Sequence, residues 1–263
     1  AKLSQKIGIN IAIDLKGFTQ DARPGIFFHR PAPIQINYLG YPGTMGADFI
    51  DYIFADKIII PQDNQINFTE KVIYLKNCYQ PNMDKREISN KTFKKSDFGL
   101  PDDAFVFCNF NSNYKITPYI FDIWMNILKR VPNSVFWILV SNSHASENLK
   151  LEAKQRGVDE NRIIFAKKIP IKEHLKRIEF ADLFLDTFPC SAHTTASDAI
   201  RMGLPIITIA GKSFASRVAA SILNQVNLKE LIVENKEDYQ KLAIDLANNK
   251  SNFEEIKNNL KRS

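Results

Sequence analysis

Residues 185–198 read LDTFPCSAHTTASD, and this stretch decides the fold of the second half of the chain. An apolar strand runs into a tight polar corner, which opens onto a helix predicted over residues 196–202. The first N–H groups of that helix, around His193, Thr194 and Thr195, have no acceptor within the helix and lie at the positive end of its dipole. Such a corner is typical of an anion site, and a phosphate group fits it.

A carboxylate follows one turn behind this corner. Thr194 and Asp198 are four residues apart and therefore share a helix face. An ionised carboxylate only accepts hydrogen bonds, which suits the diol of a sugar. The alternative is that Ser191 or Thr194 only caps the helix and that Asp198 is a solvated acid of its first turn. These residues alone leave both interpretations open.

The composition is that of a soluble globular protein. The chain has 263 residues, of which 44% are hydrophobic and 24% are charged, and its net charge is +6. This charge is compatible with anionic partners such as nucleotides. Because acidic residues are interleaved with the basic ones, we expect a solvated surface and no nucleic-acid partner.

Cysteine usage and hydropathy narrow the class of protein. Cys78, Cys108 and Cys190 are odd in number, far apart and never in a CxxC pair, which argues against disulfides and zinc. We therefore expect a reducing, cytoplasmic location. No apolar run is long enough to span a membrane, so no membrane partner is expected. The four histidines are isolated and no DxD pair is present, so no metal site is predicted.

Strands and helices alternate regularly after residue 103. The predicted strands span residues 104–110, 134–140, 162–166, 183–185, 205–209 and 231–233, and the predicted helices span residues 118–130, 148–157, 171–181, 196–202, 213–225, 237–248 and 253–260. This alternation predicts βαβ units and a Rossmann-like lobe with a parallel sheet over residues 104–263. In such sheets ligands bind beyond the carboxyl ends of the strands, where the strand order reverses.

The first half predicts a smaller lobe over residues 1–80. Its predicted strands span residues 7–15, 34–39, 51–60 and 71–75, with a helix over residues 21–30. The run 7–15 is apolar and rich in branched residues, which predicts a strand of a parallel sheet. Residues 40–46 (GYPGTMG) form a glycine-rich loop that lets backbone approach a ligand, or else a plain surface turn. The polar residues 81–103 are interpreted as the link between the two lobes.

Two further side chains follow strands of the second lobe. Lys115 lies in the polar loop after residues 104–110, where it is either a cation for a phosphate leaving group or a surface lysine before a helix. His174 opens a helix after residues 162–166, where a lone histidine is usually a capping or packing residue. Neither a Walker motif nor a dinucleotide GxGxxG is present.

Several blocks of the sequence carry a family resemblance. They are RPAPIQ (30–35) with LGYPGT (39–44), CNFN (108–111) with Lys115 and Ile116, ILKRVPNS (127–134), HTT (193–195) with Asp198, and ASRVAAS (215–221). In this order they resemble the catalytic region of O-linked N-acetylglucosamine transferases over nearly the whole chain. The resemblance implies an α/β GT-B fold, in which two Rossmann-like lobes with parallel sheets hold the sugar nucleotide between them, here with the first lobe incomplete at its N-terminus.

The resemblance also implies an activity. The family is inverting, uses no metal or other cofactor, and moves GlcNAc from UDP-GlcNAc to Ser or Thr hydroxyls of intracellular proteins. Lys115 would hold the diphosphate and stabilise the departing UDP, and Asp198 would accept from the ribose hydroxyls. The other residues implied to contact the donor are His193, Thr194 and Thr195 at the phosphates, His174, Ile169 and Pro170 near the uridine, Ser112 in the loop after CNFN, and Gly40, Tyr41, Pro42, Gly43 and Thr44 at the sugar.

The chain departs from the animal pattern at three positions. Ser112 stands where the animal enzymes carry glutamine and Ile171 where they carry lysine, which removes two contacts to the donor. Asn10 replaces a histidine. Members of the family also begin well before the position of Ala1 and usually carry tetratricopeptide repeats. No repeat is visible here, so we expect the repeats elsewhere in the same full-length protein, of which this chain is a segment.

Two rival functions stay open. A relative of the same fold transfers a different sugar, from GDP-fucose or UDP-glucose; the HTT run favours UDP-GlcNAc, because the fucosyl branch has threonines in place of His193. A rival of another class is a non-catalytic module that binds nucleotide sugars, which the changes at Ser112 and Ile171 suggest. The sequence identifies neither the acceptor proteins nor the general base.

Overall fold

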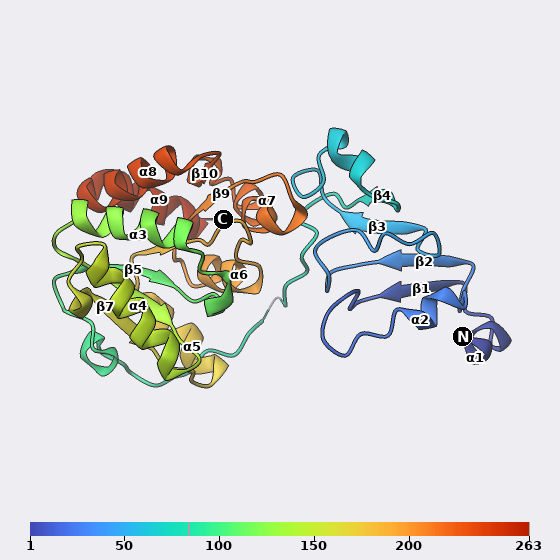
Figure 1. Cartoon of the computed structure of the whole chain (residues 1–263), viewed down its shortest axis with the longest axis horizontal. Coiled ribbons are helices and arrows are strands. Elements are labelled where there is room, and N and C mark those ends of the chain that lie inside the picture. Colours follow the sequence, from blue (N-terminus) through green and yellow to red (C-terminus); the bar gives the residue numbers. More distant parts are fainter. Residues whose placement is uncertain (84, 263) are drawn as a thin grey trace. The chain divides into compact units, whose positions relative to one another are not determined.

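The computed structural model describes residues 1–83 and 85–262, which form two compact units (Figure 1). The first unit contains Ala1–Pro81 and Lys212–Ser221, and the second contains Asn82–Gly211 and the residues from Ile222 onward. Each unit is built around its own parallel sheet, as the sequence predicts. The boundaries differ from the predicted lobes in two places, because residues 82–103 belong to the second unit and residues 212–221 to the first.

The sheet of the second unit has the strand order β10-β9-β8-β5-β6-β7, and all its strands are parallel. These strands are β5 (Phe105–Asn109), β6 (Ser134–Leu139), β7 (Ile163–Ala166), β8 (Leu183–Leu185), β9 (Ile206–Ile209) and β10 (Ile232–Val233). All six lie within one or two residues of the predicted positions. The chain builds outward from β5 through β6 to β7, then returns to β8 on the other side of β5. The order therefore reverses between β5 and β8, which is where such sheets bind ligands.

Seven α-helices follow residue 117. They are α3 (Pro118–Arg130), α4 (Ser143–Gln155), α5 (Ile171–Arg177), α6 (Thr194–Arg201), α7 (Val218–Gln225), α8 (Lys236–Asn248) and α9 (Lys250–Arg262). Short 3-10 turns lie between the helices and strands from residue 95 onward, at Lys95–Phe98, Asn113–Lys115, Glu160–Arg162, Ile178–Phe180, Phe214–Ser216 and Lys229–Leu231. Helix α3 has the predicted bounds because Thr117 caps it and Pro118 occupies its first turn. Its Trp124 is fully buried, packs on Phe136 with ring centroids 4.8 Å apart, and donates to the Tyr239 hydroxyl on α8 at 3.4 Å.

The first unit has a four-stranded parallel sheet in the order β1-β2-β3-β4. Its elements are α1 (Lys2–Lys6), β1 (Ile11–Asp14), α2 (Gly25–Phe28), β2 (Ile34–Asn37), β3 (Tyr52–Ala55), the 3-10 turn Gln62–Asn67 and β4 (Lys71–Tyr74). The predicted strand over residues 7–15 is shorter in the structure. Only the last four residues before Leu15 pair, and Ile11 and Ile13 are 52% and 45% exposed. The reason is that β1 is an edge strand, so that only one side of it pairs with a neighbouring strand.

The part of the predicted link that follows residue 84 packs on other parts of the second unit. Phe98 lies against Trp137 and Phe180, with ring centroids 5.4 Å and 5.7 Å away, and the Ser89 N–H donates to the Lys172 carbonyl oxygen at 3.2 Å. The aromatic and aliphatic residues among the polar ones supply this contact, since they remove apolar surface from water.

Residues 212–221 join the first unit through a buried carboxylate. Asp56 accepts from the Ser221 hydroxyl at 2.6 Å and from the Tyr79 N–H at 2.8 Å. The ring of Phe214 packs edge-on against Tyr79, with centroids 5.1 Å apart. Ser221 and Asp56 are 165 residues apart in sequence, so the sequence pattern does not reveal their contact.

Candidate functional site

The loops that follow β5 and β8 are joined by hydrogen bonds at the point where the strand order reverses. The Asn109 side chain donates to the Leu185 carbonyl oxygen at 2.7 Å, and its own oxygen accepts from the Asn111 N–H at 3.1 Å. The Asn111 amide group in turn donates to the Thr187 hydroxyl at 2.8 Å. All of these groups are buried. The two asparagines of the CNFN block therefore fix the two loops to each other.

Asp186 organises the loop between β8 and α6. Its Oδ1 accepts from the N–H groups of Thr187 and Ala192, both at 2.7 Å, and its Oδ2 accepts from the Thr208 hydroxyl at 2.7 Å. Burial raises the pKa of this carboxyl to about 6, while these hydrogen bonds and the charge of Lys115 act in the opposite direction. Sequence reasoning assigned Asp186 no role. The available signal was a carboxylate placed directly after a fully apolar strand.

Lys115 ends the 3-10 turn Asn113–Lys115 and points at the loop before α6. Its ammonium group donates to the Ser191 carbonyl oxygen at 2.7 Å. Ser112, which precedes this turn, is exposed. Lys115 and the start of α6 thus lie together, although they are about 80 residues apart in sequence. Their expected role in holding a diphosphate stays a prediction.

Helix α6 begins at Thr194, two residues before the predicted start, with His193 as its N-cap residue. The Thr195 hydroxyl donates to the Asn111 side-chain oxygen at 2.5 Å, so the first turn of the helix is tied to the loop after β5. Thr194 is exposed, and His193 is partly exposed. The positive end of the helix dipole and the Lys115 ammonium therefore occupy the same corner, where an anion is stabilised.

Asp198 is 5% exposed, so the alternative of a solvated acid is wrong. Its Oδ1 forms an ion pair with the Arg86 guanidinium. Burial raises the pKa of the Asp198 carboxyl, and the positive charges of Arg86 and Arg201 partly offset this effect. No sequence pattern indicated Arg86, which lies 112 residues before its partner.

His174 lies in the first turns of α5 as a neutral imidazole. Its Nδ1 faces Nε and one Nη of Arg177, at 3.0 Å and 2.8 Å. A guanidinium only donates, so Nδ1 is the acceptor and the proton is on Nε2. Burial, followed by the charges of Arg177 and Arg86, lowers the pKa of His174 to about 4. The ring packs edge-on against Phe110, with centroids 5.1 Å apart.

The two other residues expected near the uridine, Ile169 and Pro170, lie in the loop between β7 and α5, and Pro170 is the N-cap of α5. They therefore belong to the same sheet edge as His174. Arg86 connects this side of the site with the other, because its charge acts on His174 while its side chain pairs with Asp198. The sugar-side residues belong to the first unit and stay a separate prediction.

The loop Gly40–Thr44 is held by a buried carboxylate of the first unit. Glu70 accepts from the Thr44 hydroxyl at 2.5 Å and from the Met45 N–H at 2.6 Å. The Asn37 amide donates to the Gly43 carbonyl oxygen at 3.0 Å. A Cβ on Gly40 would lie 2.1 Å from the Leu15 carbonyl oxygen, so only glycine fits there. The loop, with its Tyr41 and Pro42, is thus a fixed backbone structure, and its contact with a sugar is untested.

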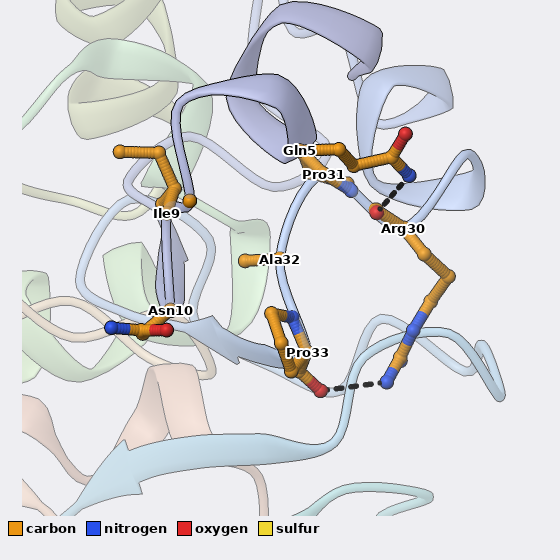
Figure 2. A pocket seen from close by; sticks show the side chains of 8 residues that line it. Gln5, Ile9, Asn10, Arg30, Pro31, Ala32 and Pro33 are labelled. Atoms are coloured by element: carbon orange, nitrogen blue, oxygen red, sulfur yellow. Dashed lines mark hydrogen bonds between the residues drawn. The ribbon is translucent and has the colours of Figure 1, made fainter.

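Asn10 lies away from these carboxyl ends, in a hollow at the amino ends of β1 and β2. Gln5, Ile9, Arg30 and Pro33 are among the residues that line it (Figure 2). There the Gln5 amide donates to the Arg30 carbonyl oxygen at 2.8 Å, and the Arg30 guanidinium donates to the Pro33 carbonyl oxygen at 2.9 Å. The Gln5 amide nitrogen and the Pro33 carbonyl oxygen are therefore already hydrogen-bonded to the protein in this hollow.

Within residues 1–83 and 85–262, no three His, Cys, Asp or Glu side chains gather in a way that would hold a metal ion. Cys78, Cys108 and Cys190 are free thiols. No helix of the described part of the chain combines the length and the apolar character that a bilayer crossing requires.

Comparison with known proteins matches the whole chain to one family. Residues 1–93 and 85–263 match Glycosyl transferase family 41. The probable UDP-N-acetylglucosamine–peptide N-acetylglucosaminyltransferase SEC of Arabidopsis thaliana is 39% identical over 100% of this chain and 28% of its own length. The UDP-N-acetylglucosamine–peptide N-acetylglucosaminyltransferase of Caenorhabditis elegans is 29% identical over 94% of this chain and 31% of its own length. The chain thus spans less than a third of these relatives.

A solved structure supports the same relationship. A mutant of the O-GlcNAc transferase of Thermobaculum terrenum superposes with a TM-score of 0.89 and 27% sequence identity, over 99% of this chain and 49% of that one. This match agrees with the two parallel sheets and their helices, and it confirms the predicted GT-B fold class.

Proposed function

Because the chain belongs to glycosyl transferase family 41, we propose that it is the donor-binding and catalytic region of a protein O-GlcNAc transferase. The relatives named above support GlcNAc as the sugar and UDP as its carrier. Since they are more than three times as long as this chain, the proposal concerns the full-length protein that contains it. Acceptor proteins and the tetratricopeptide repeats expected in that protein are part of the proposal.

The observation that carries the proposal is the meeting of Lys115 with the start of α6. A sugar nucleotide has two phosphates, and its glycosyl bond breaks only if the charge left on the diphosphate is stabilised. The Lys115 ammonium lies 2.7 Å from the Ser191 carbonyl oxygen, in the loop that leads into the first turn of α6. A cation and a helix N-terminus in one corner supply this stabilisation.

We propose that the donor lies along the edge of the second unit's sheet where the carboxyl ends of the strands meet. The diphosphate lies at Lys115 and at the backbone of His193, Thr194 and Thr195. The ribose hydroxyls donate to Asp198. The uracil lies near His174, Ile169 and Pro170, where the neutral His174 ring presents a donor at Nε2. Ser112 completes the proposed donor contacts of this unit. The contact of residues 40–44 with the sugar is a separate proposal, because these residues belong to the first unit.

The proposed reaction is a single displacement. An acceptor Ser or Thr oxygen forms a bond to the anomeric carbon from the face opposite the diphosphate, which inverts the configuration. The bond between this carbon and the phosphate oxygen breaks, and its electron pair stays on UDP. The hydroxyl proton leaves to water or to a phosphate oxygen of the donor. The attraction between the Lys115 ammonium and the diphosphate becomes stronger as negative charge develops on the departing UDP. Lys115 therefore stabilises the transition state more than it stabilises the bound donor.

No metal or cofactor is part of this proposal, since Lys115 and α6 supply the positive charge that a divalent ion supplies elsewhere. We also propose a cytoplasmic location, because the three free thiols fit a reducing compartment.

Calorimetry tests the donor directly. We expect the chain to bind UDP and UDP-GlcNAc and to bind GDP-fucose more weakly. Lys115→Ala should weaken UDP binding, whereas Lys129→Ala, at an exposed position of α3, should not. Tighter binding of GDP-fucose would favour transfer of another sugar. The absence of heat at millimolar UDP would contradict both a transferase and a nucleotide-binding module. Binding without transfer by the full-length protein would favour the non-catalytic module.

A further inference from the structure

Residues 85–91 hold one side chain against the candidate nucleoside site. The Ser89 N–H donates to the Lys172 carbonyl oxygen at 3.2 Å, and the Glu87 carboxylate pairs with the Lys172 ammonium at 2.6 Å. The Lys91 ammonium pairs with Glu173 at 2.5 Å. These contacts attach the segment to the first turn of α5. From there Arg86 reaches the Asp198 carboxylate on α6.

The ion pair uses only one oxygen of Asp198. Arg86 donates to Oδ1, and among the described residues no hydrogen bond to Oδ2 is present. Asp198 is nearly buried, and most of the Arg86 side chain is covered as well. One oxygen is therefore fixed by a cation, and the other stays available to a donor from a ligand.

The ion pair also acts on the pKa of the Asp198 carboxyl. Burial raises the pKa of this carboxyl, and Arg86 is the largest opposing influence. A protonated carboxyl presents a donor of its own, so it is a poorer partner for hydroxyl groups that must donate to it. Arg86 thus favours the form of Asp198 that only accepts.

The charge of Arg86 also acts on the first turns of α5. Ile171, the first residue of α5, is apolar and half exposed, and the next residue, Lys172, is paired with Glu87. The charge of Arg86 meanwhile reaches His174, where it helps to lower the pKa of the imidazole. One guanidinium therefore acts on both side chains that were assigned to the nucleoside.

We propose that Arg86 is a positioning residue for the nucleoside of the donor: it holds Oδ1 of Asp198, so that Oδ2 accepts hydrogen bonds from the ribose diol. This inference rests on the proposed function. Arg86 acts through Asp198, and its contribution depends on the hydroxyl groups of the ribose. A ligand that lacks them gains nothing from the pair.

The test compares UDP with 2′,3′-dideoxyuridine diphosphate by calorimetry. Arg86→Ala should weaken binding of UDP on the order of tenfold and leave binding of the dideoxy analogue nearly unchanged. Arg86→Lys keeps the charge and should restore part of the loss. The matched control is Lys85→Ala, which removes an exposed cation of the same segment that makes none of the contacts described above, and it should change neither affinity. Thermal unfolding of each variant verifies that it is folded.

Three results would overturn the inference. UDP affinity that is equal or higher in Arg86→Ala would mean that Arg86 only covers Asp198 in the absence of a ligand. An equal loss for both ligands would mean that Arg86 attracts the diphosphate or stabilises the fold. In both cases the unaltered chain still binds UDP, so the proposed function stands. Failure of the unaltered chain to bind UDP would overturn the proposed function, and this inference with it.

Discussion

The protonation of His174 yields a prediction with a defined sign and size. The folded chain holds the pKa of this imidazole at about 4, against 6.5 for a free side chain. Its contribution to stability is therefore fully present above pH 6.5 and is lost as the pH falls toward 4, because only the unfolded chain gains a proton in that window. A difference of about 2.5 between the two pKa values corresponds to about 3 kcal/mol.

The assay is urea unfolding of the unaltered chain and of His174→Gln at pH 7 and pH 4.5. Other titrating groups act on both proteins and cancel in the comparison. Between these pH values the unaltered chain should lose about 2 kcal/mol more free energy of unfolding than the variant. Two stability curves that stay parallel would refute the reasoning.

Nitrogen NMR of the unaltered chain tests the cause. The His174 ring should carry its proton on Nε2 at pH 7, because Nδ1 accepts from Arg177. Arg177→Gln should raise the pKa of His174 only part of the way to 6.5, since burial is the larger cause. A proton on Nδ1 of the unaltered chain would contradict the assignment of the tautomer.

Three further outcomes are expected. Burial raises the pKa of Asp186 to about 6, so the stability that this group contributes is present below pH 4 and is lost as the pH rises through 6. In urea unfolding from pH 4 to pH 7, the unaltered chain should therefore lose about 2 kcal/mol relative to Asp186→Asn. A change of the opposite sign would contradict this expectation. Gly40→Ala should lower the unfolding temperature of the first unit, because the added Cβ would meet the Leu15 carbonyl oxygen. The control Gly25→Ala has open space around its Cβ and should leave this temperature unchanged. Equal unfolding temperatures of the two variants would count against a rigid loop at residues 40–44. Transfer by the full-length protein should be unchanged in excess EDTA, and a loss that Mg²⁺ or Mn²⁺ restores would show that a metal takes part.

The regular part of the fold is readable from the sequence because its signals are local. Helix α3 has a cap, a first-turn proline and an apolar stripe, and its predicted bounds are those observed. Helix α4 begins at Ser143, five residues before the predicted start, because its first turns carry no apolar stripe. Its cap is Asn142, whose side chain accepts from the Ala145 N–H at 2.8 Å.

The parts of the site that sequence reasoning missed depend on distant contacts. Position in a parallel sheet predicted that Lys115 and the α6 corner meet, since loops after neighbouring strands share one edge. No periodicity reports that Arg86 pairs with Asp198 or that Asp186 binds the Thr208 hydroxyl. A polar segment such as 81–103 looks like a link in sequence, because ion pairs and a few aromatic contacts leave no repeating pattern.

The most direct test of the account is sugar-nucleotide hydrolysis and protein transfer by the full-length protein with Lys115→Ala. The account predicts that turnover of UDP-GlcNAc falls by about 100- to 1000-fold, because the departing diphosphate loses its cation, while Lys129→Ala keeps the rate of the unaltered protein. Turnover by Lys115→Ala equal to that of the unaltered protein would contradict it.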